Sequence, residues 1–285
     1  MNRLKRSWRL AMASWSVLRS DWTLLRFPIV SSILSTIMGI LVVVTLWGAG
    51  VFDSVENAEA AANGEGSLLP YVGVFILYLV TSYVVIFCNT ALISLVMARF
   101  NGRVTDPDTG WAAARARWKQ ILGWAAISAT VGVLLNVLSD RGGRIGEIVA
   151  AIGAAAWGLA TFLVIPTLVV ENVGPIDAMK RSVSLLKRTW GEQIVGNAGI
   201  GLFTGLLVLV VIVLGGGLIA LAAATGSAAV IVVSVIPVVI ALAFVIAVSS
   251  AMGAIYQAAV YRYAAGEQVD GFGEPGLIQS AFTTK

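Results

Sequence analysis

Long stretches of the chain contain no charged residue, and they alternate with shorter segments in which charges cluster. A helix needs about 20 apolar residues to cross the hydrocarbon layer of a bilayer, which is roughly 30 Å thick. Five uncharged runs are long enough, and the last can cross twice, with Thr225-Gly226-Ser227 as its turn. We therefore predict an all-α, polytopic membrane bundle with six transmembrane helices, at residues 27–52, 70–98, 120–139, 148–170, 193–224 and 228–261.

The first 26 residues carry a second pattern, in which apolar side chains recur at alternating spacings of four and three. This spacing is typical of one face of a helix. The stripe consists of Leu4, Trp8, Ala11, Trp15, Leu18, Trp22 and Leu25, and cations such as Lys5, Arg6 and Arg9 occupy the other faces. We predict an interfacial helix over residues 1–26, which suits the headgroup region of an anionic leaflet. Packing of the stripe against the protein's own spans is the alternative, and both can hold at once.

Two later segments resemble this one. The run Lys180-Arg181-Ser182, with Leu185 and Trp190 after it, repeats the spacing of Lys5-Arg6-Ser7, Leu10 and Trp15. A looser version at residues 111–124 contains Arg115, Arg117, Trp118 and Lys119. Pro175 suits the first position of a helix, so we predict a second interfacial helix over residues 175–192. Each of these segments precedes a pair of spans, which predicts a threefold repeat of one interfacial helix and one hairpin.

The distribution of lysine and arginine predicts the orientation of the chain. Of the 19 basic residues, 17 fall on one side of the predicted membrane, and only Arg141 and Arg144 fall on the other. Because basic residues concentrate in cytoplasmic segments, we expect both termini, including a tail at residues 263–285, in the cytoplasm. The whole chain, residues 1–285, is predicted to be one integral membrane domain.

Composition then limits the chemistry that the chain can perform. Charged residues make up 12% of the 285, against about 25% in soluble domains, and there is no histidine. Without histidine and with the single Cys88, Ser-His triads and Cys/His zinc sites are excluded. A phosphate-binding P-loop motif is absent, and anionic lipid accounts for the net charge of +4 without nucleic acid. We expect a protein that is not an enzyme and has no cofactor and no metal.

Several residues within or beside the spans have expected structural roles. Gly201 and Gly205 form a small-xxx-small pair, for which packing inside the bundle is expected and self-association is the alternative. Pro166 and Pro237 are expected to kink spans four and six. Glu171, at the cytoplasmic end of span four, is expected to pair with an arginine of an adjoining interfacial helix. No Asp, Glu, Lys or Arg lies in the middle of a predicted span, which argues against an ion-coupled transporter.

One stretch resembles a known family. The pattern is Pro166-x4-Glu171-x2-Gly174-Pro175-x2-Ala178-x2-Arg181-Ser182, followed by Trp190-Gly191-Glu192 and later by Tyr261-Arg262-Tyr263-Ala264-x-Gly266. It resembles an uncharacterised bacterial family of six-span membrane proteins with a domain of unknown function. It is more distantly similar to membrane domains that accompany glycerophosphodiester phosphodiesterases. The resemblance implies a bacterial origin and brings no catalytic residues.

Two hypotheses about function follow. The first is a non-enzymatic protein of the bacterial cytoplasmic membrane whose basic interfacial helices engage anionic lipid or a membrane partner. Its expected contact residues are Lys5, Arg6, Arg9, Trp8, Trp15, Trp22, Arg115, Arg117, Lys119, Lys180, Arg181, Lys187, Arg188 and Trp190. The alternative is a channel or permease for a small or lipid-like solute, which would work as a homo-oligomer if its subunits associate.

Overall fold

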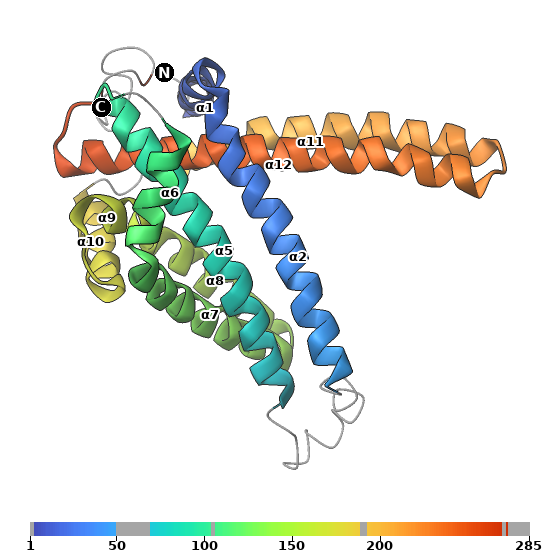
Figure 1. The fold of residues 1–285 in the computed structure, drawn as a ribbon, viewed down its shortest axis with the longest axis horizontal. Helices are drawn as coiled ribbons and strands as arrows, with labels where there is room; N and C mark the ends of the chain where they lie inside the picture. The colour runs from blue at the N-terminus through green and yellow to red at the C-terminus, as the bar shows by residue number, and fades with distance from the viewer. Residues whose placement is uncertain (1–2, 50–68, 104–105, 189–192, 270–271, 273–285) are drawn as a thin grey trace. The chain divides into compact units, whose positions relative to one another are not determined.

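The computed structural model describes residues 3–49, 69–103, 106–188, 193–269 and 272 (Figure 1). These residues form helices and the turns between them, with no strand among them. The chain divides into two compact units. Unit 1 contains residues 1–29, 92–110 and 185–285, and unit 2 contains residues 30–91 and 111–184. Each unit is described by itself.

Six helical segments are long and apolar enough to cross a membrane, which confirms the predicted number of spans. They are formed by α2 (Arg26–Gly48), α5 (Leu69–Phe100), α7 (Trp118–Arg141), α8 (Gly143–Ala160) together with α9 (Val164–Glu171), α11 (Gln193–Ala224) and α12 (Ala228–Ala265). The chain is therefore an all-α, multi-pass membrane protein.

Shorter helices precede each pair of spans. They are α1 (Arg3–Ser20) with the 3-10 turn η1 (Trp22–Leu25), α6 (Pro107–Ala116) and α10 (Pro175–Arg188). The order of the helices along the chain is thus the order that the threefold plan predicted.

Unit 1 is built on an antiparallel hairpin of α11 and α12 (Figure 1). The helices reverse at Gly226, whose φ of +68° lies in the left-handed region that favours glycine. Close to the middle of the hairpin, a Cβ on Gly215 would lie 2.7 Å from a methyl group of Val238, so only glycine fits there. Helix α1 packs on both α11 and α12 through a fully buried face that includes Leu10, Ala11 and Leu18.

Unit 2 contains a second hairpin, of α7 and α8. Helix α7 ends at Arg141, and α8 begins two residues later, because Gly142 and Gly143 make a very tight turn. A Cβ on Gly142 would overlap the Cα of Gly146, and Gly143 has a φ of +54°. This turn is shorter than the loop that the sequence predicted at residues 140–147. Deeper in the hairpin, the rings of Trp124 and Trp157 stack with centroids 5.7 Å apart.

Span four, predicted at residues 148–170 with a kink at Pro166, is confirmed as an apolar segment and is divided into two helices. Helix α8 ends at Ala160, and α9 begins at Val164 after three residues that are not helical. Pro166 explains the position of the break, because a proline has no N–H to donate and its ring clashes with the carbonyl four residues earlier. That carbonyl belongs to Phe162, inside the break. Pro237, by contrast, lies inside α12, which continues as one helix through it.

The interfacial segments also differ from their predicted bounds. Residues 1–26 are not one helix, since Asp21 is extended and its carboxylate accepts a hydrogen bond from the N–H of Thr23 to start η1. The looser segment at residues 111–124 is divided by Arg117, which has a non-helical backbone between α6 and α7. Helix α10 ends at Arg188, and the predicted residues Trp190, Gly191 and Glu192 lie outside the described part of the chain.

Gly201 and Gly205 do not mark the contact between α11 and α12, and their packing role in the whole bundle stays a prediction. Both glycines are exposed, and no atom of the described residues lies within 4 Å of a Cβ built on either one. The close approach between α11 and α12 occurs at Gly215 instead. Spacing alone favoured the earlier pair, whereas the crossing point of the two helices decides which glycine is needed.

Candidate functional site

The most elaborate polar structure in unit 2 surrounds the break in span four. We call residues 161–182 the hook: they comprise the break, α9, the turn after it and the first half of α10. Every residue from Leu163 to Val169 is buried. Backbone groups that are exposed by a break inside an apolar environment must find other partners. The hook supplies these partners from side chains.

Ser182 of α10 satisfies the two backbone groups at the break. Its hydroxyl donates to the carbonyl of Ala160 at 2.7 Å, and it accepts a hydrogen bond from the N–H of Leu163 at 3.1 Å. Ser182 is completely buried. One hydroxyl therefore replaces two missing helical bonds, and it fixes α10 against the break.

Arg117 closes the other end of α9. Its guanidinium donates to the carbonyls of Leu168 and Val169, at 3.1 and 2.8 Å, and to the carbonyl of Ala113 at 3.1 Å. A cation at the C-terminal end of a helix also interacts favourably with the helix dipole. Burial lowers the pKa of Arg117 from its ordinary value, but a guanidinium stays charged at neutral pH.

The turn between α9 and α10 is fixed by an ion pair. Asn172 ends α9 in the left-handed conformation with a φ of +51°. The Nε atom of Arg181 then lies 2.8 Å from a carboxylate oxygen of Glu171. Arg181 is the arginine of an adjoining helix that we expected as the partner of Glu171. On the other side of the turn, a Cβ on Gly123 of α7 would lie 3.1 Å from the ring of Pro175.

The geometry of the hook indicates what it can do chemically. In transporters with broken helices, the free carbonyls at the end of a half-helix coordinate cations. Here the guanidinium of Arg117 already lies on two of these carbonyls. Among the described residues there is no group of three or more Cys, Asp or Glu side chains that could hold a metal ion. The polar groups of the hook are therefore bonded to other parts of unit 2, and they fix α9 and α10 in place. We call such a polar contact that fixes one helix to another a lock.

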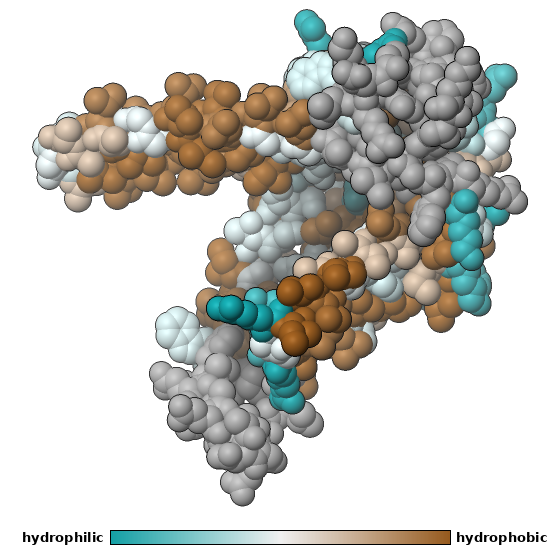
Figure 2. All heavy atoms as spheres, turned by 180° about the vertical axis from the view of Figure 1, so that it is seen from behind, coloured by the Kyte–Doolittle hydropathy of each residue, from teal (hydrophilic) through white to brown (hydrophobic). Residues whose placement is uncertain are grey.

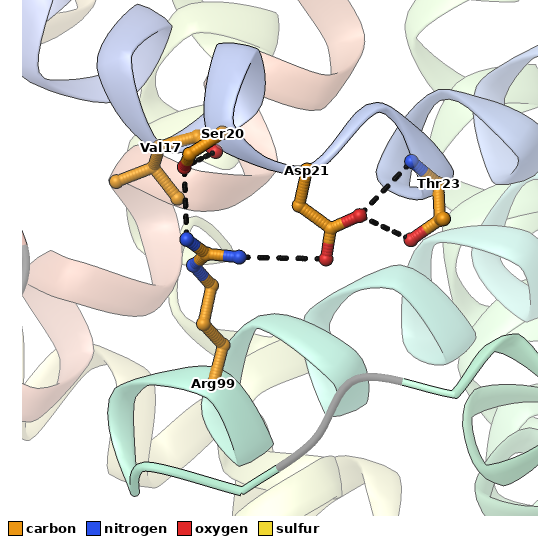
Figure 3. A network of polar contacts seen from close by, with 5 residues as sticks. All are labelled: Val17, Ser20, Asp21, Thr23 and Arg99. Atoms are coloured by element: carbon orange, nitrogen blue, oxygen red, sulfur yellow. Dashed lines mark hydrogen bonds and ion pairs between the residues drawn. The ribbon is translucent and has the colours of Figure 1, made fainter.

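Unit 1 contains a second lock, where α1 ends (Figure 3). Arg99, near the end of α5, donates to the hydroxyl of Ser20 at 2.8 Å and lies 3.4 Å from a carboxylate oxygen of Asp21. The other oxygen of Asp21 accepts from the N–H of Thr23. This network fixes the corner between α1 and η1 to the end of α5.

A third lock lies at the end of α12. Arg262 is 9% exposed and donates to the side-chain oxygen of Asn101 at 2.9 Å, just beyond α5. Its Nε atom lies 3.2 Å from a carboxylate oxygen of Glu267, although the hydrogen-bond geometry of that contact is poor. Gly266 ends the helix with a φ of +83°. Arg262 and Gly266, two residues of the C-terminal motif, thus have defined structural roles.

The remaining predicted contact residues are distributed over the surfaces of the two units. Exposed cations include Arg115, Lys119, Lys180 and Lys187, and the amine of Lys119 lies 5.6 Å from the ring centre of Trp118. Arg9 is half-exposed, whereas the side chains of Lys5, Arg6 and Arg188 lie outside the described part of the chain. Arg117 and Arg181 have partners inside unit 2, at the end of α9 and in the turn after it. Lipid contact of all these residues stays a prediction.

The tryptophans of α1 lie at the edge of its buried face. Trp8 and Trp22 are 40% and 49% exposed. Trp15 lies between them, with ring centres 5.9 Å from Trp22 and 6.1 Å from Phe203 of α11. One alternative for the stripe is observed, since Ala11 and Leu18 are buried and α1 packs on α11 and α12. Contact of the half-exposed indoles with headgroups stays a prediction.

A family model matches residues 68–272, which is more than two thirds of the chain. The chain belongs to DUF6159. It is described as a family of unknown function. No curated protein and no solved structure matches the chain. The hook and the Arg262 lock lie inside the segment that the DUF6159 model matches, and α1 lies before it.

Sequence reasoning missed some of these functions. Arg117 was assigned to lipid contact because it lies in a basic cluster, and nothing in its sequence context distinguishes it from Arg115. Nothing in the sequence around Asn101 predicted its hydrogen bond to Arg262 either. The Pro166-to-Ser182 motif, by contrast, contained the break-forming proline, both members of the ion pair and the capping serine.

Proposed function

We propose that the protein is a non-enzymatic protein of the bacterial cytoplasmic membrane whose exposed cations bind anionic phospholipid headgroups. The locks fix the interfacial helices to the spans, and the exposed cations are then held at the membrane surface. The proposed cytoplasmic position of both termini follows from the distribution of basic residues. Bacterial origin and the distant similarity to phosphodiesterase-associated domains stay predictions from the sequence motif.

The observation that carries the proposal is that some cations bond inside the protein, whereas others, both lysines and arginines such as Arg115, are exposed. Four arginines, Arg99, Arg117, Arg181 and Arg262, have internal partners. Each lysine whose side chain the structure describes is exposed, namely Lys119, Lys180 and Lys187, and Lys180 also lies 3.6 Å from a carboxylate oxygen of Asp177 on the same exposed face. A guanidinium suits bonds of fixed geometry, and both an exposed guanidinium and an exposed ammonium can bind phosphate. Each cation near an anionic surface contributes about 1 kcal/mol to binding.

The channel or permease alternative has less support. Its motivation was the glycine-rich fifth span and the kinked helices. Gly201 and Gly205 face outward, the break in span four has its own hydrogen-bond partners, and its free carbonyls hold Arg117. The exposed glycines could instead contact a second subunit. Such self-association is compatible with the binding of anionic lipid.

The proposal is tested by measuring lipid selectivity in nanodiscs. Spin-labelled phosphatidylglycerol and phosphatidylcholine report how strongly each lipid associates with the protein. Lys119→Gln with Lys180→Gln should reduce the selectivity for phosphatidylglycerol by up to about 30-fold, since two contributions of about 1 kcal/mol are lost. The selectivity of the native protein should also fall with salt, because exposed charges are screened.

The matched control removes two exposed cations from the predicted opposite side of unit 2. Arg141→Gln with Arg144→Gln should retain most of the selectivity. Equal behaviour of the native protein toward the two lipids, or of the lysine variant and the native protein, would exclude the proposed function.

A further inference from the structure

Helix α12 is much longer than a membrane requires. It contains 38 residues, which corresponds to a length of about 57 Å at 1.5 Å per residue. The hydrocarbon layer is only about 30 Å thick. About half of the helix must therefore lie elsewhere, although hydropathy cannot indicate which half, since no charge occurs between Gln193 and Tyr261.

Burial divides α12 into two halves with different surroundings. From Ala228 to Ile246, only Ser234 and Val245 are buried, and large apolar side chains such as Ile240 and Ile246 are 64% and 57% exposed. From Ala247 onward most residues are buried, and no large apolar side chain of the helix is exposed. The first half is about 19 residues long, or about 28 Å, which fits one crossing of the hydrocarbon.

The apolar surface of the first half is shared with α11. Large exposed side chains of α11 extend from Leu202 to Leu221, and Figure 2 shows the hairpin as an almost continuous hydrophobic arm. Measured from the turn at Gly226, about 22 residues of α11 lead back to Phe203. Thr204 donates to the hydroxyl of Ser249 at 2.8 Å, so Phe203 and Ser249 lie at the same level of the hairpin.

An aromatic cluster lies at this level. The rings of Trp8 and Trp15 lie 5.8 and 6.1 Å from Phe203, and Trp22 adjoins Trp15. Indole rings are enriched where one end of a side chain meets hydrocarbon and the other meets headgroups. Of the exposed arginines nearby in the sequence, Arg19 lies between Trp15 and Trp22, and Arg26 follows Trp22, as expected beside phosphate groups.

Beyond this level, the second half of α12 is covered by protein. It contacts α1 and η1, and Arg262 donates a hydrogen bond to the side chain of Asn101, just beyond the end of α5. We call α1, η1, residues 92–103 and residues 247–265 the proximal body. All of its members belong to unit 1.

We propose that the edge of the hydrocarbon layer crosses unit 1 at Phe203 and Ser249, with the aromatic cluster in the interfacial layer and the proximal body outside the hydrocarbon. The aromatic cluster contacts the interfacial layer of the same bilayer that α11 and α12 cross. The surface is continuous with the apolar arm through Phe203. This inference requires only that the hairpin crosses a membrane, and it does not depend on the binding of anionic lipid.

Nitroxide labels on single cysteines measure the depth of each position. In a Cys88→Ala background, labels are placed at Ile240, Ile246, Ser250 and Gln257 along α12, and at the exposed Ser16 of α1. The protein is held in nanodiscs of phosphatidylcholine alone, so the result is independent of the proposed headgroup binding. Collisions with oxygen report hydrocarbon, and collisions with a water-soluble nickel complex report the aqueous side.

The expected profile changes sign along α12. Oxygen should dominate at Ile240, the two reagents should balance between Ile246 and Ser250, and nickel should dominate at Gln257. The Ser16 label, at a position with ample space, should also favour nickel, and it provides the result if the Gln257 variant does not fold. Oxygen dominance at Ser16 or at a folded Gln257 variant, equal to that at Ile240, would overturn the inference.

The role of the aromatic cluster has its own control. Trp8→Ala with Trp22→Ala should move the Ser16 label toward water, because the two half-exposed indoles no longer hold α1 in the interface. Trp47→Ala removes a tryptophan that is 69% exposed at the other end of span one, and it should leave the Ser16 label unchanged. An unchanged label in the double variant would remove the aromatic cluster from the proposal.

Discussion

A single hydroxyl replaces the backbone partners that are lost where α8 ends. Ser182 is buried and bonds to one donor and one acceptor of the main chain. Two unsatisfied backbone groups in a buried place cost more than the bonds themselves contribute, since each loses its solvation as well. The hook therefore concentrates stability in one small side chain.

Replacing Ser182 by alanine should destabilise the protein by about 1–3 kcal/mol, because the carbonyl of Ala160 and the N–H of Leu163 lose their partner. Ser184→Ala is the matched control, as that hydroxyl is exposed and bonds only locally to the carbonyl of Arg181. Thermal unfolding in detergent compares the two variants. Equal melting temperatures for both would contradict the assigned role of Ser182.

At the residue scale, the sequence was informative wherever partners lie close in the chain. Glu171 and Arg181 are ten residues apart, and a break between them brings their helices together, so their pairing followed from the Gly174-Pro175 signal. Arg117 bonds to carbonyls about 50 residues away. Such a partner depends on where the junction of α6 and α7 lies relative to the end of α9, which local patterns do not contain.

At the scale of helices, charges located the ends of most spans to within a few residues. Deviations occur where one side chain interrupts a regular pattern. Helix α1 ends before Asp21, whose carboxylate accepts a hydrogen bond from the nearby N–H of Thr23. The ring of Pro166 clashes with the carbonyl of Phe162, four residues earlier, and this clash breaks the fourth span. Hydropathy is unaffected by either interruption, so these breaks did not follow from the apolar pattern.

Gly215 and Gly216 provide a test of helix packing in unit 1. Gly215→Ala should destabilise the hairpin by about 1–3 kcal/mol, since its Cβ would meet the stiff, β-branched Val238 at 2.7 Å. A Cβ on the neighbouring Gly216 meets no atom within 4 Å, so Gly216→Ala should be neutral or slightly stabilising. Thermal unfolding of both variants, made side by side, measures the difference. A larger loss at Gly216 would show that the outer face of α11 is covered by another partner.

At the scale of the whole molecule, six spans require both termini on the same side of the membrane. Single cysteines in a Cys88→Ser background test this topology with a membrane-impermeant maleimide. Asp140→Cys and Thr225→Cys, at two span-connecting turns, should react in intact cells. Arg19→Cys and Lys180→Cys should react only after permeabilisation, as the distribution of basic residues predicts. Reaction of Arg19→Cys in intact cells would reverse the predicted orientation.

The long uncharged stretch of residues 193–261 also has a consequence for biogenesis. The insertion machinery recognises apolar length, and here it meets 69 residues with no charge to mark where a span should stop. Several vertical positions of the hairpin would then be nearly equal in energy until other parts of the chain dock. Helix α1 is synthesised before α12 and lies at the membrane surface when α12 is inserted. Docking of α12 on α1 would then favour one vertical position of the hairpin. The N-terminal helix would thereby determine the depth at which the α11–α12 hairpin lies in the bilayer.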